Sequence, residues 1–414
     1  MESVCSVSWN RKSLKATVHL PSSKSISNRI LIMQALCGKK FPVKNLSEAD
    51  DTKLLLRLLS SGEKILDAGN AGTSFRFLTA YLAQKNGERI LTGSDRMKQR
   101  PIGELVDALH RLGGEIKHVD KENFPPLAIQ GKKLIGNKFE IDSSQSSQFV
   151  SSLLLIAPYV EGGLKLKLTG KESSSPYIDM TLKLMAHFGI KVLKKNNTIE
   201  ISQQQYAPEK YSVEPDWSSA SFWYGMAALS DDAEILFPQL TSESIQGDSV
   251  IAELMKTFHV ETGFISESTV ISHHKKPVSR KHSFNFSKCP DLAPVFFVLC
   301  SALGIEAKFS GLKNLSIKES NRTEALKTEL EKCGAMIIKE NEDEFRIMPH
   351  PLPPFAEGRE RSFETYSDHR LAMAFAMLAI PFGKVEIKNP AVVSKSYPGF
   401  WNDLRSAGFE ITFA

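Results

Sequence analysis

The sequence predicts an α/β protein of two similar domains, each with three repeats of strand, buried helix, strand, amphipathic helix and further strands. Three observations carry this prediction. The chain has 414 residues, more than one hydrophobic core usually serves, which favours two domains. An almost wholly apolar helical segment with a small or polar start occurs six times, at intervals of roughly 70 residues after the first. Amphipathic helical segments lie between most of these.

The six apolar segments predict the buried helices. Each begins with a small or polar residue and continues as an apolar helical stretch, and several end at a glycine. In chain order they are 23–38 "SKSISNRILIMQALCG", 70–87 "NAGTSFRFLTAYLAQKNG", 143–163 "SSQSSQFVSSLLLIAPYVEGG", 216–230 "DWSSASFWYGMAALS", 290–304 "PDLAPVFFVLCSALG" and 367–383 "SDHRLAMAFAMLAIPFG".

The intervening segments predict amphipathic helices followed by strands. A glycine after the last turn suits the left-handed residue that closes many helices, and the next run alternates apolar and polar residues as a half-buried strand does. Examples are 101–119, 177–193, 247–261, 322–338 and 398–413.

Six such units divide naturally into two domains of three units each. The first unit is shorter, and residues 7–20 precede it as an orphan strand or hairpin that we assign to the domain of the last unit. We therefore expect a discontinuous domain of 1–20 plus 216–414, an inserted domain of 21–215, and hinges near Leu20 and Pro215. The alternative is an α/β solenoid without a cleft, which the chemistry of the helix starts disfavours.

Composition narrows the class of function. Fifty-two lysines and arginines against 47 acidic residues give a net charge of +5, too mild and too scattered for nucleic-acid binding. The five cysteines show neither CxxC nor Cys/His metal-ligand spacing. The N-terminus has no apolar signal region, and no run approaches the ~20 apolar residues of a membrane span. We expect a cytoplasmic monomer that acts on small molecules.

The first three helix starts carry more polar groups than capping requires. One side-chain oxygen is enough to cap a helix, yet the first start has Lys24, Ser25 and Arg29. The second offers Gly72, which lets backbone approach a ligand closely, and the third offers the hydroxyls and amides of 143–148. A helix N-terminus attracts anions, so the set indicates anion binding, whereas each start taken alone also fits an ordinary cap or polar loop.

The fifth and sixth helix starts carry ions. Asp291 stands before an apolar helix, where a carboxylate serves either as a cap or as a base. Asp368, His369 and Arg370 share one turn before another apolar helix, where an uncompensated charge is costly. The spacing leaves open whether the anion that pairs with Arg370 is protein or substrate.

Further cations lie at predicted element ends. Arg100 precedes Pro101, "IKESNR" places Lys318, Glu319 and Arg322 at a strand-to-helix junction, and Lys395 stands in a run of small residues. Solvated charge is the alternative for each. Together the cations exceed the need of one monoanion, so we infer two phosphate- or carboxylate-bearing substrates bound between the domains. These cations are Lys24, Arg29, Arg100, Arg322, Arg370 and Lys395.

Ten motifs in order give this chain a close resemblance to the 5-enolpyruvylshikimate-3-phosphate synthase family, over nearly its whole length. They are "SKSISNR", "GNAGTSFRFL", "RMKQRPIGELVDAL", "SSQSSQF", "SPYIDMTL", "DWSSAS", "PDLAP", "IKESNR", "YSDHRLAMA" and "SKSYPGFW".

The resemblance implies a fold and a reaction. The fold is two inside-out α/β barrels of three βαβαββ units with buried parallel helices, and the active site lies in the cleft between the domains. The enzyme, a transferase of the shikimate pathway of chorismate and aromatic amino-acid biosynthesis, moves the carboxyvinyl group of phosphoenolpyruvate to the 5-hydroxyl of shikimate 3-phosphate and releases phosphate. No metal or organic cofactor is implied.

The resemblance also implies roles for residues that match the family's motifs. As catalytic residues it implies Asp291 as the base toward the 5-hydroxyl, Glu319 as proton donor to C3, and Lys24 as the group that stabilises the leaving phosphate. The order of these proton transfers stays open. The implied ligands of shikimate 3-phosphate are Lys24, Ser25, Arg29, Ser146, Ser147, Gln148, Ser174, Asp291, Asn314 and Lys318. The implied ligands of phosphoenolpyruvate are Lys24, Gly72, Arg100, Gln148, Arg322, Arg370 and Lys395.

Four positions depart from the family pattern: Ser22 and Phe77 replace a common glycine and proline, and Gln99 and Asn321 replace a common glutamate and aspartate. None of these replacements removes a charged ligand.

Two alternative functions are kept. A UDP-N-acetylglucosamine enolpyruvyl transferase typically has asparagine after the first lysine and a loop cysteine, and neither is found here. A non-catalytic phosphosugar-binding protein is expected to lose Asp291 or Glu319.

Overall fold

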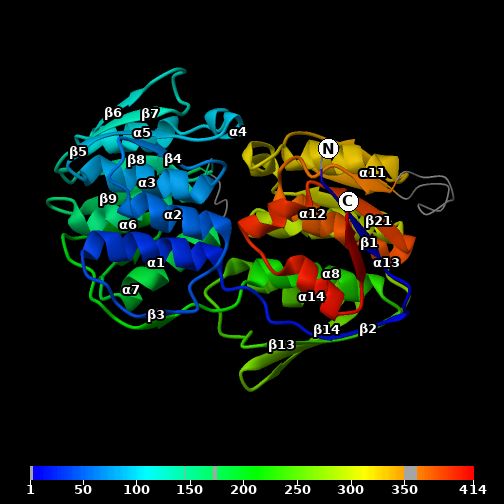
Figure 1. The fold of residues 1–414 in the computed structure, drawn as a ribbon. Coiled ribbons are helices and arrows are strands. Elements are labelled where there is room, and N and C mark those ends of the chain that lie inside the picture. The colour runs from blue at the N-terminus through cyan, green and yellow to red at the C-terminus, as the bar shows by residue number, and fades with distance from the viewer. Residues whose placement is uncertain (1–2, 145, 171–174, 349–360) are drawn as a thin grey trace. The chain divides into compact units, whose positions relative to one another are not determined.

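The computed structural model describes residues 3–144, 146–170, 175–348 and 361–414, which combine helices and sheets as the α/β prediction requires (Figure 1). The chain divides into two compact units. Unit 1 comprises Met1–Ser22, Glu48–Asp50 and Glu214–Ala414, and unit 2 comprises Ser23–Ser47 and Asp51–Val213.

Five four-stranded sheets share one topology in the described residues. The first two strands of each pair in parallel across a helical crossover, and the other two pair antiparallel, with the last strand inserted beside the second. Unit 2 has β4 (Ile65–Asp67), β5 (Gly87–Thr92), β7 (Leu127–Gly131) and β6 (Glu115–His118) in one sheet, and β8 (Lys138–Asp142), β9 (Leu164–Thr169), β11 (Thr198–Ile201) and β10 (Leu193–Lys195) in the next.

Unit 1 builds three such sheets, two of them with strands from the start of the chain. β2 (Ser13–Thr17) supplies the first strand of a sheet with β13 (Asp232–Pro238), β15 (Ser268–His274) and β14 (Val260–Ile265). β1 (Val4–Ser8) supplies the inserted strand between β21 (Lys384–Lys388) and β22 (Glu410–Phe413), next to β20 (Ser362–Phe363). The third sheet contains β16 (Lys281–Asn285), β17 (Glu306–Ser310), β19 (Phe345–Met348) and β18 (Met336–Lys339).

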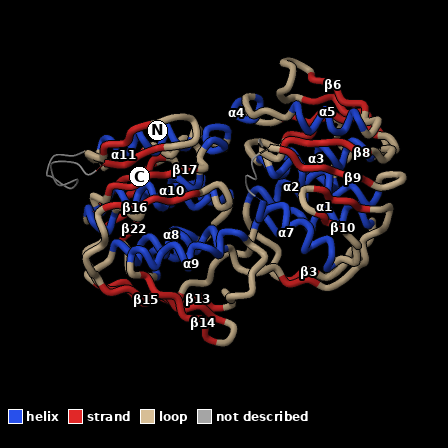
Figure 2. Tube along the Cα trace, turned by 180° about the vertical axis from the view of Figure 1, so that it is seen from behind, coloured by secondary structure: helices blue, strands red, loops and turns tan. Residues whose placement is uncertain are grey.

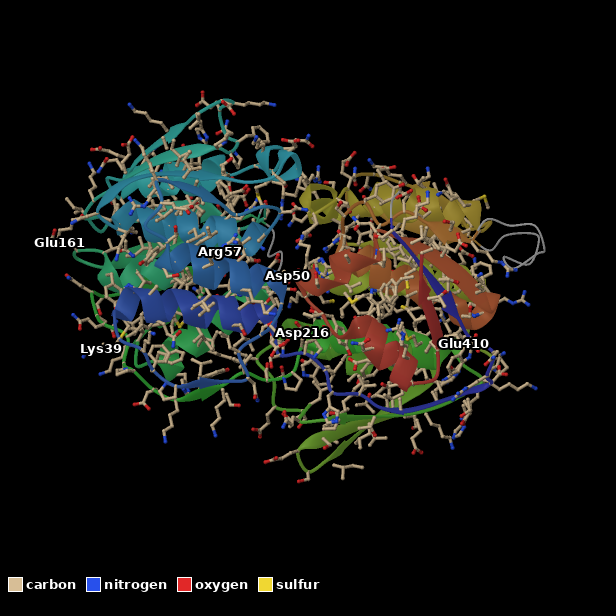
Figure 3. The ribbon with its side chains drawn as sticks, viewed as in Figure 1. Lys39, Asp50, Arg57, Glu161, Asp216 and Glu410 are labelled. Carbon is tan, nitrogen blue, oxygen red and sulfur yellow. The ribbon has the colours of Figure 1, made fainter. Side chains whose placement is uncertain are left out.

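The helices of unit 2 form its core. α1 (Lys24–Cys37), α3 (Gly72–Gln84) and α6 (Ser147–Ile156) contact one another, and most of their side chains are buried. Figure 3 shows Lys39 and Glu161, which follow α1 and η1 (Ala157–Tyr159), at the same edge of unit 2, so α1 and α6 run in one direction. The other helices are α2 (Asp50–Ser60), α4 (Asp95–Lys98), α5 (Gly103–Arg111) and α7 (Ser175–His187).

Unit 1 has the same design, with helices inside and strands at its outer faces (Figure 2). Its buried helices are α8 (Trp217–Leu229), α10 (Ala293–Leu303) and α12 (His369–Ala376), and α10 contacts both others. The remaining helices are α9 (Ile251–Leu254), α11 (Arg322–Lys332), α13 (Ala379–Phe382), α14 (Phe400–Ser406), η2 (Gly247–Val250), η3 (Met255–Phe258), η4 (Pro290–Leu292), η5 (Lys313–Ile317) and η6 (Pro390–Lys395).

Side chains at the helix starts explain where several helices begin. The carboxylates of Asp216 and Asp368 accept the backbone N–H of Ser219 and of Arg370, at 3.0 Å in both cases. These bonds satisfy amides that have no partner inside the helix. Ser23 occupies the cap position of α1, but its hydroxyl makes no capping bond.

Two features differ from the sequence prediction. The single helix expected over 247–261 is divided into η2, α9 and η3. The last of these, η3, ends at His259, which has the left-handed conformation (φ 58°). The shorter first repeat supplies α1 and α2 but, among the described residues, only one strand, β3 (Val43–Lys44), which pairs with β12 (Tyr211–Ser212). None of the described helices is long and apolar enough to cross a membrane.

Candidate functional site

The start of α3 gathers residues from four other segments of unit 2. We call this the α3 cluster: Lys24, Asp51, Gly72, Thr73, Ser74, Arg100 and Gln148. Ser74 Oγ donates to the backbone carbonyl of Asp51 at 3.2 Å, and Gln148 Nε2 donates to Thr73 Oγ1 at 3.0 Å. Residues that the sequence placed at separate helix starts therefore converge on one helix end.

Lys24 forms an ion pair inside this cluster. Its Nζ lies 2.9 Å from Asp51 Oδ2, and the two side chains are 12% and 8% exposed. Sequence reasoning missed Asp51, although the acidic start of α2, "EADD", was visible. The pairing fixes the ammonium group at the amino end of α1, where an anion also meets the helix dipole.

Gly72 makes room for Arg100. A Cβ atom at Gly72 would lie 2.5 Å from Arg100 Nη1, so any side chain here displaces the guanidinium. Arg100 is 3% exposed. The close approach predicted for Gly72 thus involves an arginine that the sequence had also selected.

Arg29 is buried between α1, α6 and α7 and is 2% exposed. Its Nε donates to Thr181 Oγ1 at 2.8 Å, and Nη1 donates to the carbonyl of Ser25 at 2.8 Å. Nη2 donates to the carbonyl of Tyr177 at 3.2 Å and to Ser151 Oγ at 3.4 Å. No carboxylate among the described residues pairs with Arg29, so its charge remains available to a bound anion. Burial lowers the pKa of Arg29 to about 10, which keeps it cationic at neutral pH.

The remaining predicted residues of unit 2 lie at the start of α6 or beyond the described part. Ser146 is the N-cap, and its hydroxyl accepts the N–H of Gln148 at 3.2 Å. Ser147 is the first residue of α6 and is 8% exposed. Ser25 lies in the first turn of α1. Ser174 lies outside the described residues.

Unit 1 brings together three cations and three carboxylates at the starts of α10, α11 and α12. We call this the Asp291 cluster: Asp291, Lys318, Glu319, Arg322, Asp368 and Arg370. Asp291 Oδ1 lies 2.9 Å from Arg322 Nη1 and 3.6 Å from Lys318 Nζ, and Oδ2 lies 3.0 Å from Arg370 Nη2. Three of the predicted cations thus surround the predicted base.

Arg322 is the centre of this network and is 1% exposed. Besides Asp291, it donates from Nη2 to Glu319 Oε2 at 2.8 Å and from Nε to Asp368 Oδ2 at 2.7 Å. Burial alone would lower the pKa of Arg322, but the paired carboxylates outweigh that effect and raise it above the ordinary arginine value. The sequence predicted more cations than one monoanion needs and left the partner of Arg370 open; in this unit Arg370 pairs with the carboxylate of Asp291, and Arg322 with those of Asp291, Glu319 and Asp368.

Electrostatics keep Asp291 ionised. Burial alone would raise its pKa, but the charges of Arg370, Lys318 and Arg322 outweigh that effect and hold the pKa well below the usual range. A carboxylate in this state is a weak base until one of its cations is drawn away.

Asp248, in η2, was not selected from the sequence. Burial, followed by repulsion from Asp291, raises its pKa to about 6, and the hydroxyl of Ser218 donates to its Oδ2. Asp248 lies in an amphipathic segment, where a single acidic residue does not stand out in the sequence as a candidate site residue. A buried carboxylate beside the Asp291 cluster adds a group that titrates near neutral pH.

Two other predicted residues lie on 3-10 helices of the same unit. Asn314 belongs to η5, the 3-10 helix that stands between β17 and the "IKESNR" segment, so the junction predicted as strand-to-helix is instead η5-to-helix. Lys395 is the last residue of η6, which packs against α12.

Comparisons with known proteins agree on one family. The model of the family described as EPSP synthase (3-phosphoshikimate 1-carboxyvinyltransferase) matches residues 9–61 and 55–404. A 3-phosphoshikimate 1-carboxyvinyltransferase from Bacteroides fragilis is 43% identical over 404 residues, covering 96% of each chain. One from Haemophilus influenzae is 34% identical over 423 residues, covering 94% of this chain and 96% of the relative.

The fold agrees with solved structures as well. An EPSP synthase structure from Acinetobacter baumannii superposes with a TM-score of 0.76 at 20% identity and covers 100% of both chains. This likeness confirms the predicted two-domain α/β fold class.

Proposed function

This chain belongs to the EPSP synthase family, and we propose that the α3 cluster and the Asp291 cluster bind the two substrates and move the protons of that family's reaction. The reaction transfers the carboxyvinyl group of phosphoenolpyruvate to the 5-hydroxyl of shikimate 3-phosphate and releases phosphate, a step of the shikimate pathway. The observation that carries the residue assignment is Asp291 held by three cations beside Glu319.

The cations suit the charges of the substrates. Phosphoenolpyruvate carries a phosphate and a carboxylate, and guanidinium groups bind such groups in a bidentate manner. Arg322 and Arg370 are proposed to bind phosphoenolpyruvate together with Arg100. Because Arg322 already donates to three carboxylates, a substrate anion must compete with at least one of them.

Through this competition, substrate binding is proposed to turn Asp291 into an effective base. If phosphoenolpyruvate draws Arg370 or Arg322 away from Asp291, the pKa of Asp291 rises because it loses a neighbouring positive charge. Asp291 then accepts the proton of the 5-hydroxyl as that oxygen attacks C2, and Glu319 gives a proton to C3. The second half reverses C3 protonation: C3 returns a proton to the Glu319 carboxylate, the C2–O bond to phosphate breaks, and Lys24 stabilises the departing phosphate.

In unit 2, Arg29 is proposed as a ligand of the shikimate phosphate. Its guanidinium has hydrogen bonds but no carboxylate partner among the described residues, and Ser25 lies one turn before it on the same helix. A dianion near this helix start gains from both the cation and the dipole. The predicted interdomain location of the site, the cytoplasmic location and the monomeric state stay predictions.

Phosphate release from phosphoenolpyruvate is the experiment that tests the proposed function. Release is expected to need shikimate 3-phosphate and to be absent with UDP-N-acetylglucosamine as the acceptor. Equal release with both acceptors, or none above background with shikimate 3-phosphate, overturns the assignment.

A further inference from the structure

The two residues directly before Asp368 have an unusual backbone conformation. Tyr366 and Ser367 both adopt the left-handed conformation, with φ angles of 52° and 55°. Residues other than glycine rarely do so, because the Cβ atom crowds the backbone. Two consecutive residues of this kind store strain, and they lie next to the carboxylate that holds Arg322 and caps α12. Such strain persists only where neighbouring contacts hold the turn in place.

Glu329 fastens this turn to α11 and is fully buried. Its Oε1 accepts the hydroxyl hydrogen of Tyr366 at 2.8 Å, and its Oε2 accepts the backbone N–H of Glu364 at 3.0 Å. Lys332 Nζ lies 2.8 Å from Oε2 and balances the charge. Burial, followed by the bond to Glu329, raises the pKa of Tyr366, so the phenol keeps its proton and acts as the donor.

Helix α11 therefore holds the turn at two points. Arg322, its first residue, donates to both oxygens of Asp368, and Glu329 follows seven positions later on the same helix. Seven residues make almost two helical turns, so the two side chains leave one face, about 10 Å apart along the axis. Between the two contacts the chain forms a tight turn, in which the N–H of Asp368 donates to the carbonyl of Thr365 at 2.8 Å. A loss at one contact is thus felt at the other.

We propose that Glu329 and Tyr366 are a positioning pair for the binding of phosphoenolpyruvate. The pair holds the strained turn, the turn places the carboxylate of Asp368, and that carboxylate aligns Arg322 and Arg370. Neither member of the pair belongs to the Asp291 cluster, and both act through Asp368. The inference rests on the proposed function, in which the two arginines bind phosphoenolpyruvate.

Tyr366→Phe tests the pair through the kinetics of phosphate release. Tyr366 is 42% exposed and Glu329 keeps its other two bonds, so the variant is expected to fold. The KM for phosphoenolpyruvate should rise about fivefold or more, while the KM for shikimate 3-phosphate changes less than about twofold. Tyr224→Phe is the matched control, because it removes a buried hydroxyl that lies 3.0 Å from Thr262 Oγ1 in the same unit. An unchanged KM for phosphoenolpyruvate, or an equal rise in both KM values, overturns the positioning role.

Relief of the strain provides a rescue experiment. Glycine adopts a positive φ without a steric penalty, so Ser367→Gly should make the turn less dependent on the hydrogen bond. Added to Tyr366→Phe, it is expected to return the KM for phosphoenolpyruvate to within about twofold of the parent value. A double variant with the same KM as Tyr366→Phe overturns the link between the pair and the strain.

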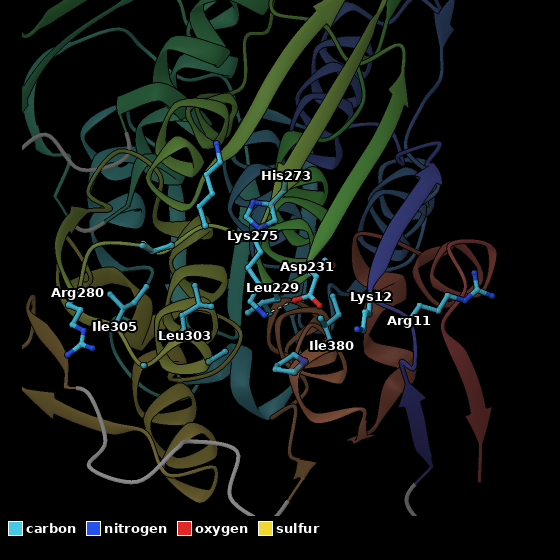
Figure 4. Close-up of a pocket in the computed structure, with 17 residues that line it drawn as sticks. Arg11, Lys12, Leu229, Asp231, His273, Lys275, Arg280, Leu303, Ile305 and Ile380 are labelled. Atoms are coloured by element: carbon cyan, nitrogen blue, oxygen red, sulfur yellow. Dashed lines mark hydrogen bonds and ion pairs between the residues drawn. The ribbon is translucent and has the colours of Figure 1, made fainter.

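Hydrogen exchange followed by mass spectrometry separates this inference from the proposed function. The amide of Arg370 donates to Asp368 and should exchange at least about tenfold faster in Tyr366→Phe. The reference is the amide of Lys275, which donates to the carbonyl of Asp231 at 2.9 Å, beside the ion pair of the same two residues (Figure 4). This reference lies in a pocket at the carboxyl ends of α8 and α10 and should exchange as in the parent chain.

The outcomes of the exchange measurement do not depend on activity. Unchanged exchange at Arg370, or equal acceleration at Arg370 and Lys275, overturns the positioning role, because the second result marks a general loss of stability. If the parent chain releases no phosphate with shikimate 3-phosphate, the proposed function fails. Faster exchange at Arg370 alone would still show that the pair holds Asp368 in place.

Discussion

The guanidinium of Arg322 donates to both oxygens of Asp368, from Nε to Oδ2 at 2.7 Å and from Nη2 to Oδ1 at 3.3 Å. Asp368 is fully buried and also caps α12 through the N–H of Arg370. One carboxylate thus aligns the two arginines proposed to bind phosphoenolpyruvate. This arrangement is a bidentate, charge-assisted pair, the geometry that fixes an arginine most firmly.

Asp368→Asn is expected to lower the free energy of unfolding by about 3 kcal/mol, because it leaves the buried Arg322 without its bidentate partner. Urea unfolding followed by circular dichroism measures this change. Glu306→Gln breaks an ion pair with Lys281, whose side chain is 78% exposed, and should cost less than about 1 kcal/mol. Equal losses in the two variants would contradict the central place given to Asp368.

Lys24→Met should lower kcat at least about a hundredfold while the protein stays folded, because the leaving phosphate loses its cation. Phosphate release and thermal melting are the two readouts. Lys39→Met removes an exposed cation just beyond the same helix and is the matched control. A Lys24→Met variant that keeps most of its activity would show that the catalytic lysine is misplaced.

Gly72→Ala should raise the KM for phosphoenolpyruvate by about tenfold or more, because the new Cβ displaces the Arg100 guanidinium and weakens a charge-assisted contact. Gly62→Ala is the control, since its Cβ would meet nothing within 4 Å. Steady-state kinetics with each substrate varied in turn measures the change. A rise in the KM for shikimate 3-phosphate alone would assign Arg100 to the other substrate.

The raised pKa of Asp248 predicts that the free energy of unfolding falls as pH rises. Its folded pKa of about 6 lies above the unfolded value of 3.8, so the folded state binds more protons between these values and stability falls as pH rises through that window. Asp248→Asn removes the titration. Its unfolding free energy relative to the parent chain should therefore be higher at pH 7.5 than at pH 4.5, by roughly 2 to 3 kcal/mol.

The control for Asp248 is Asp95→Asn, a carboxylate whose side chain is 97% exposed. Its effect on unfolding should be nearly the same at both pH values, because an exposed carboxylate keeps its solvation on folding. If Asp248→Asn behaves like Asp95→Asn, the burial of Asp248 does not govern its titration.

The fold was largely predictable because its signals are local. Each buried helix is largely apolar and begins beside a small or polar residue, as α8 does after Asp216. The division of 247–261 into three short helices was not predictable, because its apolar spacing fits one amphipathic helix equally well. The pairing of β1 with β21 and β22 joins the two ends of the chain, which sequence periodicity only suggests.

The sequence singled out most residues of the two clusters but did not predict their charge balance. Asp291 and Arg370 stood out because ions are unusual before apolar helices, and Arg322 stood out at a predicted strand-to-helix junction. Their mutual pairing depends on contacts between residues that are 31, 46 and 79 positions apart, which no local pattern encodes. Asp51 and Asp248 were missed for the same reason. Asp51 matters because it pairs with Lys24, and Asp248 because it lies near Asp291, and both partners are distant in the sequence.

Proton magnetic resonance of the reaction in deuterium oxide tests the central claim most directly. If C3 of phosphoenolpyruvate becomes a methyl group in the intermediate, rotation of that group leaves deuterium in the vinyl methylene of the product. We expect a vinyl ether on the 5-oxygen of shikimate 3-phosphate that carries deuterium, formed at least about a hundredfold more slowly by Glu319→Gln. A product without deuterium, or equal rates for the parent chain and Glu319→Gln, would contradict the proposed proton transfer.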